Sequence, residues 1–338
     1  MNSGKQKMVS EKYRYLGTTG VSVSPLCLGT MTFGREADEA MSGSIYRASR
    51  EAGINFFDCA NVYSVGKAER ILGRLVEGER DHVVITTKVG GKWGDDPNAR
   101  GCSRRHIIRS VEGSLRRLRT DYIDVYFLHH FDPHARLEEA FGALDHLIRA
   151  GKILYAGVSN FAAWQVMKSL GIEDTRGWNR VQCLQPMYSL AKRQAEVEIL
   201  PLAASEKLGV ITYSPLGGGL LTGKYHGEAV SEDGRLRVSE VYGKRYAGEA
   251  NKDLAKRFSE FARSGGYAPA SLAVAWVAHH PAVTAPIIGA RNLEQLGESL
   301  GALKIEMSAG LYDQVSALSP SPPPATDRSE VETRSRIS

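Results

Sequence analysis

The sequence has few cysteines and no long apolar run. Its four cysteines form no C-x-x-C pair and have no histidine at zinc-finger spacing, and the carboxylates and histidines around His129 fit no common metal-ligand set, so we expect neither disulfides nor a metal site. No apolar stretch approaches the roughly 20 residues of a membrane-spanning helix, and the polar N-terminus lacks the apolar segment of a secretory signal. The sequence therefore predicts a protein that is cytoplasmic and has no membrane partner.

An excess of one charge sign is also absent. The chain of 338 residues has 43 Lys and Arg against 38 Asp and Glu, a formal net charge of +5. The densest basic group, Arg116-Arg117-Leu118-Arg119, is typical of the end of a helix, where cations complement the helix dipole. No aromatic or glycine-rich signature of a nucleic-acid module accompanies the basic residues. We therefore expect no nucleic-acid partner, and the hydrophobic content of 42% predicts an ordinary globular core.

Apolar runs rich in β-branched and aromatic residues recur eight times, with helix-like segments between most of them. The strand-like runs are 25–29, 54–58, 83–88, 122–129, 153–159, 181–185, 209–214 and 283–289. The expected helices are 37–52, 68–76, 104–119, 136–150, 162–170, 194–207 and 269–279. This alternation predicts an α/β protein with a (β/α)8 TIM barrel. A doubly wound sheet is the alternative, but the segment 29–34 lacks the G-x-G-x-x-G fingerprint that usually follows its first strand.

The segments outside this alternation suggest how the chain is divided. Two short extended stretches flank Thr18-Thr19-Gly20, which predicts an N-terminal β-hairpin that could close the bottom of the barrel. We expect a flexible N-terminus over 1–12, a single barrel domain over 13–318 and a disordered, proline-rich and polar tail over 319–338. The polar stretch 224–251 is expected to be a long loop that acts as a lid.

Four polar residues end or closely follow strand-like runs: Asp58, Tyr63, Lys88 and His129. In a barrel the carboxyl ends of the strands meet at one face, so these side chains should share one pocket. Reduction of a carbonyl requires a proton donor and a group that stabilises the negative oxygen. Tyr63 is the candidate donor, and the ammonium of Lys88, with Asp58 as its counter-charge, should lower the phenol pKa from about 10. His129 is the candidate hydrogen-bond donor to the substrate oxygen.

The motifs around these residues resemble those of the aldo-keto reductase family over about residues 13–318. Phe57-Asp58-Cys59-Ala60-Asn61-Val62-Tyr63 is similar to the family's aspartate-to-tyrosine segment, Thr87-Lys88 to its lysine strand, and Asp124-Val125-Tyr126-Phe127-Leu128-His129 to its histidine strand. The resemblance implies that Tyr63 is the general acid, that Lys88 and Asp58 tune it, and that His129 orients the carbonyl. Cys59 stands where a small hydroxyl residue is usual, which we expect to be a tolerated packing change.

The resemblance also implies a nicotinamide dinucleotide cofactor. Ser159, Asn160 and Gln185 resemble the residues that hold the carboxamide, Tyr213 the aromatic on which the nicotinamide stacks, the loop 214–224 the diphosphate site and the segment 287–299 the adenosine site, in which Ser299 replaces the usual asparagine. The expected cofactor-binding residues are Gly29, Thr30, Met31, Asp58, Ser159, Asn160, Gln185, Tyr213, Ser214, Leu216, Gly218, Lys224, Arg235, Gly289, Arg291, Gln295, Glu298 and Ser299. Because Arg235 or Arg291 could bind a 2′-phosphate, NADP(H) is favoured over NAD(H).

Three functional interpretations follow. The first is an NADPH-dependent reductase of aldehydes or ketones that acts by direct hydride transfer, with a small carbonyl or alcohol substrate; oligomerisation is left open. The second is a nicotinamide-binding regulatory subunit resembling potassium-channel β-subunits, which have counterparts of Leu216, Lys224 and Gln295 but lack a histidine at position 129, so His129 favours an enzyme. The third is a P-loop NTPase, because 218–224 fits G-x-x-x-x-G-K, but Tyr225 replaces the required Ser or Thr. The substrate cannot be read from the sequence, although Trp93 suggests an apolar wall.

Overall fold

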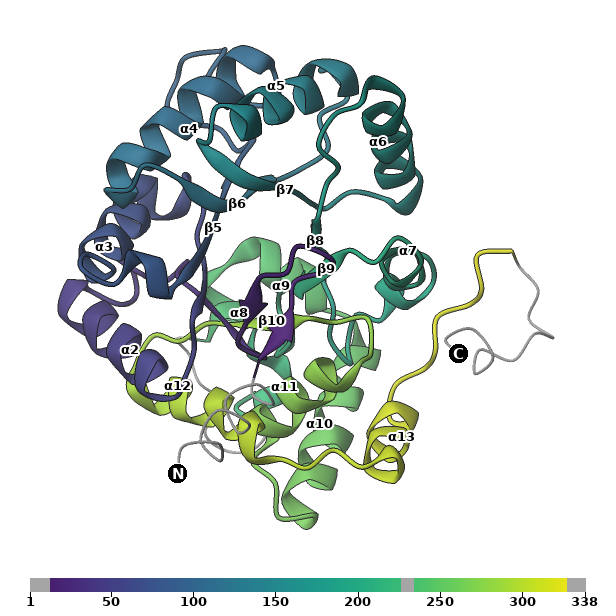
Figure 1. The fold of residues 1–338 in the computed structure, drawn as a ribbon. Helices are drawn as coiled ribbons and strands as arrows, with labels where there is room; N and C mark the ends of the chain where they lie inside the picture. Colours follow the sequence, from purple (N-terminus) through teal and green to yellow (C-terminus); the bar gives the residue numbers. More distant parts are fainter. Residues whose placement is uncertain (1–12, 226–233, 327–338) are drawn as a thin grey trace, which may run out of the picture.

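Eight parallel strands close into a barrel at the centre of the molecule. The computed structural model describes residues 13–225 and 234–326, and within them the strand order is β10-β3-β4-β5-β6-β7-β8-β9, with helices around the outside (Figure 1). The strands are β3 (Cys27–Gly29), β4 (Phe56–Asp58), β5 (Val84–Val89), β6 (Ile123–Leu128), β7 (Ile153–Ser159), β8 (Cys183–Gln185), β9 (Gly209–Thr212) and β10 (Ala285–Ile288). The predicted TIM barrel is confirmed, with several strands shorter than expected.

Seven of the helices around the barrel correspond to expected ones. They are α2 (Glu39–Glu51), α3 (Lys67–Leu75), α4 (Arg104–Leu118), α5 (Leu137–Arg149), α6 (Ala163–Arg176), α7 (Ile199–Ser205) and α11 (Pro269–His279). Two of these differ clearly in length from the prediction. Helix α6 runs six residues past 170, and the segment predicted at 194–207 is divided into a 3-10 turn, η3 (Gln194–Glu196), and the shorter α7.

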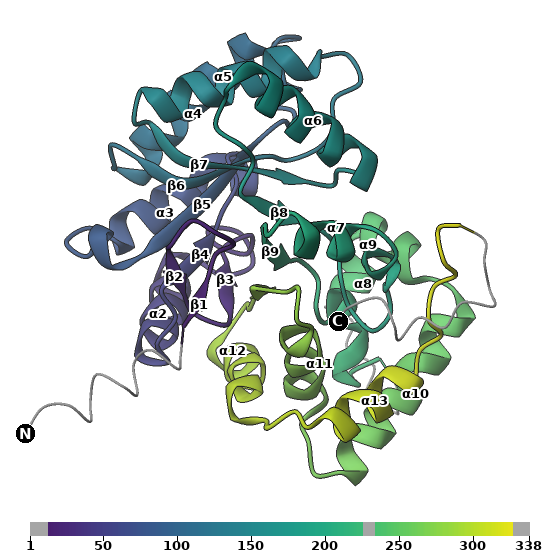
Figure 2. The ribbon, with the colours of Figure 1, turned by 45° about the vertical axis from the view of Figure 1, so that its right-hand side comes forward.

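The stretch 224–251 is not one long loop, so that part of the prediction is wrong. Its described part contains the short helices α8 (Arg235–Val238) and α9 (Glu240–Tyr246) and the start of α10 (Glu249–Ser264), while 226–233 lie outside the described residues. Two further helices, α12 (Leu293–Leu300) and α13 (Ala309–Ala317), complete the outer layer, and α13 lies beside α10 and α11 (Figure 2). The remaining 3-10 turns are η1 (Tyr63–Gly66), η2 (Arg80–His82), η4 (Gly217–Thr222) and η5 (Gly301–Lys304).

The N-terminal hairpin closes one end of the barrel, as the sequence predicts. Strand β1 (Arg14–Tyr15) pairs antiparallel with β2 (Ser22–Val23), and the hairpin lies across the middle of the barrel in Figure 1. Leu16 is fully buried and packs with Phe56 and Phe127 of the barrel interior. The hairpin approaches closely, because a Cβ added to Gly209 would lie 2.5 Å from Leu16 Cδ1. Burial of these apolar side chains favours a barrel that is closed at this end.

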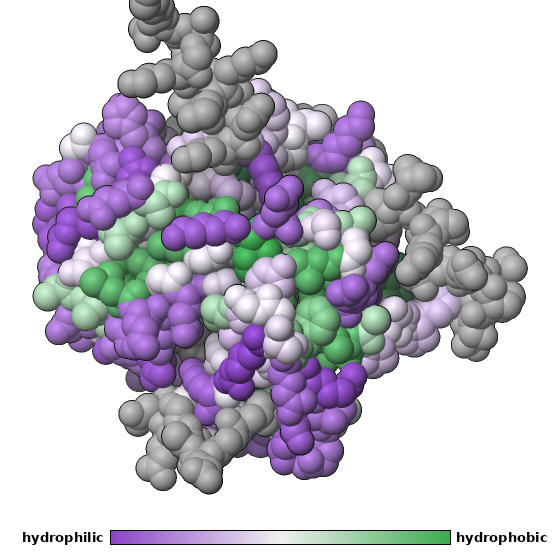
Figure 3. Space-filling view, turned by 90° about the horizontal axis from the view of Figure 1, so that it is seen from below, coloured by the Kyte–Doolittle hydropathy of each residue, from purple (hydrophilic) through white to green (hydrophobic). Residues whose placement is uncertain are grey.

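The described part of the C-terminal segment has no regular secondary structure. Residues 319–326 contain no helix or strand, while the expected flexible N-terminus 1–12 and the end of the expected tail, 327–338, lie outside the described residues. Within the described residues, no helix has the length and apolar content required to span a membrane. On the face shown in Figure 3, apolar side chains form a band across the middle, and hydrophilic side chains surround it.

Candidate active site

A cavity of about 830 Å³ lies at the carboxyl ends of the strands. Its wall includes Gly29 at the end of β3, Asp58 at the end of β4, Ser159 at the end of β7 and Gln185 at the end of β8. The hairpin closes the opposite end of the barrel, so the cavity opens at the face where barrel enzymes carry their chemistry. Its volume is within the range of small-molecule and cofactor sites.

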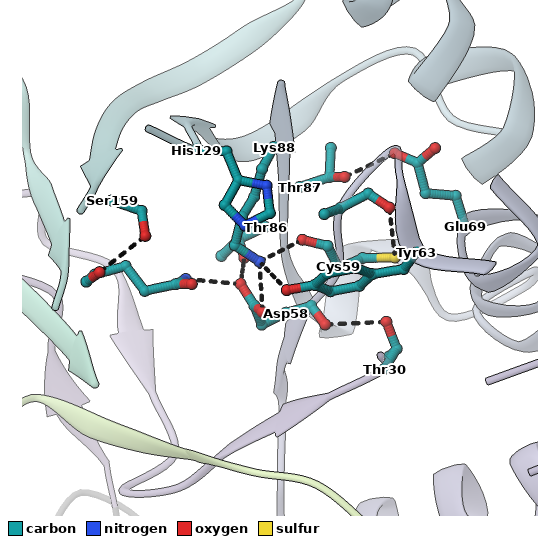
Figure 4. Close-up of polar contacts among 12 residues, drawn as sticks. Thr30, Asp58, Cys59, Tyr63, Glu69, Thr86, Thr87, Lys88, His129 and Ser159 are labelled. Carbon is teal, nitrogen blue, oxygen red and sulfur yellow. Dashed lines mark hydrogen bonds and ion pairs between the residues drawn. The ribbon is translucent and has the colours of Figure 1, made fainter. Parts of the chain in front are cut away.

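The structure brings Asp58, Lys88 and Tyr63 into direct contact beside this cavity. Lys88 Nζ lies 2.6 Å from Asp58 Oδ2 and 3.3 Å from Tyr63 Oη, as Figure 4 shows. The Lys88 side chain is fully buried, whereas Asp58 and Tyr63 both contribute to the cavity wall. Neighbouring strands produce this contact, because β4 and β5 pair with Asp58 opposite Thr86, two residues before Lys88 on the same side of β5.

Further hydrogen bonds fix the Asp58–Lys88 pair. Thr86 Oγ1 and Gln185 Nε2 donate to Asp58 Oδ1 at 2.7 and 2.8 Å, and Lys88 Nζ also donates to the Cys59 carbonyl at 2.6 Å. A buried ion pair is stable only when its remaining donors and acceptors are satisfied, and these contacts provide that. Sequence reasoning missed Thr86, although its position two residues before Lys88 on one strand was a usable signal.

Burial and charge act in opposite directions on both partners of the Lys88–Tyr63 contact. Burial by itself lowers the pKa of Lys88, but the carboxylate of Asp58 and the phenol of Tyr63 raise it above its ordinary value, so Lys88 is an ammonium. Burial raises the pKa of Tyr63 to about 12, and Lys88 opposes this only in part. The expectation that the ammonium brings the phenol pKa below about 10 is therefore wrong for the net effect, because desolvation of the phenolate is the larger contribution.

His129 lies next to Tyr63 at the end of β6. The two rings are 6.1 Å apart between centroids, edge to face, and His129 contributes to the cavity wall. Burial, together with the positive charge of Lys88 and the neighbouring His130, lowers the pKa of His129 well below its usual value. Its Nδ1 atom is buried and has no hydrogen-bond partner within the described residues. His129 is therefore a neutral imidazole at physiological pH.

The residues expected at the nicotinamide carboxamide form one connected hydrogen-bond group. Tyr213 Oη donates to Asn160 Oδ1 at 2.7 Å, and Asn160 Nδ2 donates to the His129 carbonyl at 2.9 Å. Ser159 Oγ donates to the Gln185 carbonyl at 2.9 Å. Asn160 has a left-handed backbone with φ 56°, which asparagine adopts more readily than most residues. Ser159, Asn160, Gln185 and Tyr213 all border the cavity.

The loop after β9 also borders the cavity. Gly217, Gly218 and Gly219 have φ values of 58°, 68° and 96°, in the left-handed region that favours glycine. Of the residues expected here, Ser214, Leu216, Gly218 and Lys224 line the cavity. Helix α9 covers this loop, because a Cβ on Gly218 would lie 2.7 Å from the Tyr242 ring. Tyr242 and Arg245 of α9 also line the cavity; sequence reasoning placed this segment only in a lid-like stretch.

The segment after β10 forms another part of the cavity wall. Gly289, Arg291, Gln295 and Glu298 line it; the Gln295 side chain accepts a hydrogen bond from the Arg291 backbone amide at 3.2 Å. Ser299 is 1% exposed and is not in the cavity wall.

Three other residues from the sequence analysis lie away from the cavity wall or cannot be placed in it. Thr30 is fully buried and hydrogen-bonds the Asp58 carbonyl instead. Arg235 begins α8, but its side chain lies outside the described part of the chain. Trp93 does not line the cavity, so the expected apolar wall is not seen at this residue: its ring lies 4.6 Å from the Arg117 guanidinium. Met31 and Gly29, by contrast, are part of the wall.

Among the described residues, no group of three or more His, Cys, Asp or Glu is placed to hold a metal.

Comparison with known proteins agrees with this geometry. The model of the Aldo/keto reductase family matches residues 25–320. An uncharacterized oxidoreductase of Bacillus subtilis (strain 168), YrpG, is 38% identical over 322 residues, which cover 92% of this chain and 97% of that protein. Probable voltage-gated potassium channel β-subunits of Arabidopsis thaliana and of Oryza sativa subsp. japonica are 35% and 34% identical, covering 87% and 94% of this chain and 92% and 99% of those proteins. These matches support an oxidoreductase with a nicotinamide cofactor, and the chain belongs to the aldo/keto reductase family.

Proposed function

We propose that this oxidoreductase is an NADPH-dependent carbonyl reductase that converts aldehydes or ketones to alcohols, with Tyr63 as the general acid. The observation that carries the proposal is the contact of Tyr63 Oη with Lys88 Nζ at 3.3 Å, on the wall of a cavity that also contains His129. A phenol, an ammonium and a neutral imidazole at one cavity wall are the groups that carbonyl reduction requires.

The residues along the cavity fit a nicotinamide dinucleotide. The wall has amide and hydroxyl groups of Ser159, Asn160 and Gln185, with the Tyr213 ring beside them. It also has the glycine loop with Lys224, whose open backbone and positive charge suit a diphosphate, and Arg291 of the segment after β10. When bound, the cofactor supplies the hydride that reduces the carbonyl carbon.

Each side chain of the site has a separate role in the reaction. Tyr63, whose pKa is about 12, keeps its proton at neutral pH and can donate it to the substrate oxygen. Lys88 stabilises the phenolate that remains, and Asp58 holds Lys88 in place and charged. His129, neutral in this setting, donates a hydrogen bond that orients the carbonyl oxygen. Tyr213 restricts the cofactor ring to one orientation, so that one face meets the substrate.

Replacement of Tyr63 by Phe tests the proton-donor role. The Tyr63→Phe variant should bind NADPH with nearly unchanged affinity, measured by fluorescence titration, and should lose turnover by at least ~100-fold, a typical share for general acid catalysis. Tyr155→Phe is a matched control, because Tyr155 Oη donates to the Thr19 carbonyl in the hairpin at the other end of the barrel. A near-normal rate in Tyr63→Phe would show that another group donates the proton.

Cofactor choice is a separate part of the proposal. Arg291 lines the cavity, and a charge-assisted contact between arginine and a 2′-phosphate contributes roughly 10- to 100-fold in affinity. Arg291→Ala should therefore weaken NADPH binding much more than NADH binding, while Arg105→Ala, an exposed arginine outside the cavity wall, should change neither. Equal losses for the two cofactors would remove Arg291 from the 2′-phosphate site and leave Arg235 as the candidate.

The second candidate function is a nicotinamide-binding regulatory subunit, which the similarity to two probable potassium channel β-subunits favours. His129 in the cavity beside Tyr63 supports the enzyme instead. An aldehyde panel followed by NADPH absorbance separates the two functions. A regulatory protein would bind NADPH without consuming it with any member of the panel.

The cellular location, the domain limits and the oligomeric state of the protein are also part of the proposal. A cytoplasmic location is supported by the four cysteines, which are all buried free thiols. The domain limits 13–318 and the lid role of the segment that contains α8 and α9 remain predictions. An oligomer could form through the apolar band in Figure 3, which gel filtration with light scattering would test.

A further inference from the structure

A second histidine lies beside His129 in the cavity wall. The His130 ring stacks on the His129 ring with centroids 4.6 Å apart and an angle of 5° between the planes, and both rings line the cavity. Tyr63, His129 and His130 thus form a row along the wall, with His129 in the middle. The functional roles assigned to Tyr63 and His129 leave His130 without one.

The backbone around His130 is held firmly. The Val89 carbonyl accepts a hydrogen bond from the His129 amide at 2.7 Å, and the His130 carbonyl accepts one from Cys102 Sγ at 3.4 Å. The next residue, Phe131, packs edge to face against Phe161 with ring centroids 5.5 Å apart. The backbone that carries the two stacked imidazoles is therefore fixed, which favours a selective binding site.

Asn160 lies next to one nitrogen of the His130 ring. Asn160 Nδ2 is 3.4 Å from His130 Nδ1, but its two hydrogens have nearer acceptors, the His129 carbonyl at 2.9 Å and Ser159 Oγ at 3.0 Å. Partial burial lowers the pKa of His130, which keeps the ring neutral, so one ring nitrogen donates and the other accepts. Among the described residues no protein group is hydrogen-bonded to Nε2, so this nitrogen is available to a ligand. A hydroxyl group can bond to Nε2 in either tautomer, because a hydroxyl both donates and accepts.

We propose that His130 determines substrate specificity through a hydrogen bond between its Nε2 atom and a hydroxyl group next to the reacting carbonyl. The inference rests on the proposed function, because it takes Tyr63 and His129 as the groups that contact the carbonyl oxygen. The stacked rings lie side by side in the cavity wall, so together they can reach oxygens on adjacent carbons of one substrate. The substrate class is then an α-hydroxy carbonyl compound, and simple alkanals are weaker substrates.

The test compares two aldehydes that differ by one hydroxyl group. Wild-type protein, His130→Phe and His130→Gln are assayed with NADPH on 2-hydroxypropanal and on propanal, and the ratio of the two kcat/KM values is taken for each protein. A difference in intrinsic reactivity between the two aldehydes is the same for every protein, so it cancels when the ratios are compared. General damage to the site lowers kcat/KM for both aldehydes, so it cancels within each ratio. Phenylalanine keeps a ring against His129 but cannot form the hydrogen bond, whereas glutamine keeps both a donor and an acceptor.

The ratio should fall about tenfold in His130→Phe, the typical effect of one neutral hydrogen bond, and should largely return in His130→Gln. An unchanged ratio in His130→Phe would overturn the inference and leave the proposed reductase intact.

A binding experiment keeps the two proposals separate. Lactamide and propanamide have the same difference of one hydroxyl group but are not reduced, so their binding to the NADPH-loaded protein can be followed by cofactor fluorescence. Lactamide should bind about tenfold more tightly than propanamide to wild type and lose this advantage in His130→Phe. Equal discrimination in both proteins would contradict the role of His130. Absence of turnover with both aldehydes would contradict the reductase function only.

Discussion

The protonation of Tyr63 depends on a balance between desolvation and two nearby charges. Burial and the carboxylate of Asp58 favour the neutral phenol, Lys88 favours the phenolate, and the resulting pKa is about 12. A proton donor must be protonated before it acts, so this balance suits reduction at neutral pH. The reverse reaction needs the phenolate, which is scarce at neutral pH and becomes more abundant as pH rises.

The two directions of the reaction should therefore differ in pH dependence. From pH 6 to 9 the rate of aldehyde reduction should stay nearly constant, because Tyr63 remains protonated and the pKa of His129 lies well below 6.5. Alcohol oxidation should accelerate with pH, by up to about tenfold per unit while the phenolate is the minor form. Single-turnover rates in both directions would measure this. A reduction rate that falls as the pH drops through 6.5 would contradict the assignment of a neutral His129.

At the scale of single residues, the sequence could indicate which side chains lie together, but not how far burial shifts their pKa values. Asp58, Lys88 and His129 end strand-like runs, and a parallel barrel gathers strand ends at one face. The extent of desolvation depends on neighbours far apart in the sequence, such as Gln185, whose side chain donates to Asp58 across 127 positions. This is why the sign of the net pKa change at Tyr63 could not be predicted.

At the scale of elements, α8, α9 and α10 show two kinds of missed helix. Helix α10 buries Leu254, Phe258 and Ala262 at spacings of four residues, a pattern that was visible in the sequence. Helices α8 and α9 have four and seven residues, too short to be stable alone. Packing of Tyr242 against the glycine loop stabilises α9, and this tertiary contact left no periodic signal.

The extension of α6 beyond residue 170 buries an acidic residue whose ionisation should affect stability. Glu173 is 1% exposed and accepts a hydrogen bond from the Val181 amide at 3.1 Å. Burial raises its pKa from 4.5 to about 8, against the opposing effects of that hydrogen bond and of Arg180. The folded state therefore binds this proton more tightly than the unfolded state. The contribution of protonated Glu173 to the free energy of unfolding is complete below pH 4.5 and is lost as pH rises through 8.

Glu173→Gln should remove this pH dependence, because glutamine keeps an acceptor for Val181 and has no charge to desolvate. At pH 7 to 8 the variant should be more stable than wild type, on the order of 3 kcal/mol, and the difference should shrink towards pH 5. Urea unfolding at several pH values measures it. The control is Glu260→Gln, at an exposed position of α10. A constant difference across this pH range would show that Glu173 does not titrate between the two states.

At the scale of the whole molecule, the hairpin closes one end of the barrel and the candidate active site lies at the other end. The alternation of eight strand-like runs with helices was enough to predict this architecture, since few other folds repeat the unit eight times. The position of the hairpin could only be suggested, because its two-residue strands carry a weak signal. In the structure Val23 and Leu16 are fully buried against the barrel interior.

Leu16→Ala should therefore destabilise the whole barrel while leaving the chemistry intact. Leu16 has no exposed surface, and truncation of a buried leucine to alanine costs about 2 to 5 kcal/mol. Guanidinium unfolding would measure the loss, and NADPH-dependent turnover of the folded variant should stay near that of wild type, because Tyr63 and His129 lie at the opposite end. Tyr15→Ala is the matched control, since Tyr15 is adjacent in the hairpin but 69% exposed. If both variants unfold at the wild-type midpoint, the hairpin adds nothing to the barrel; if Leu16→Ala folds but is inactive, the two ends are coupled.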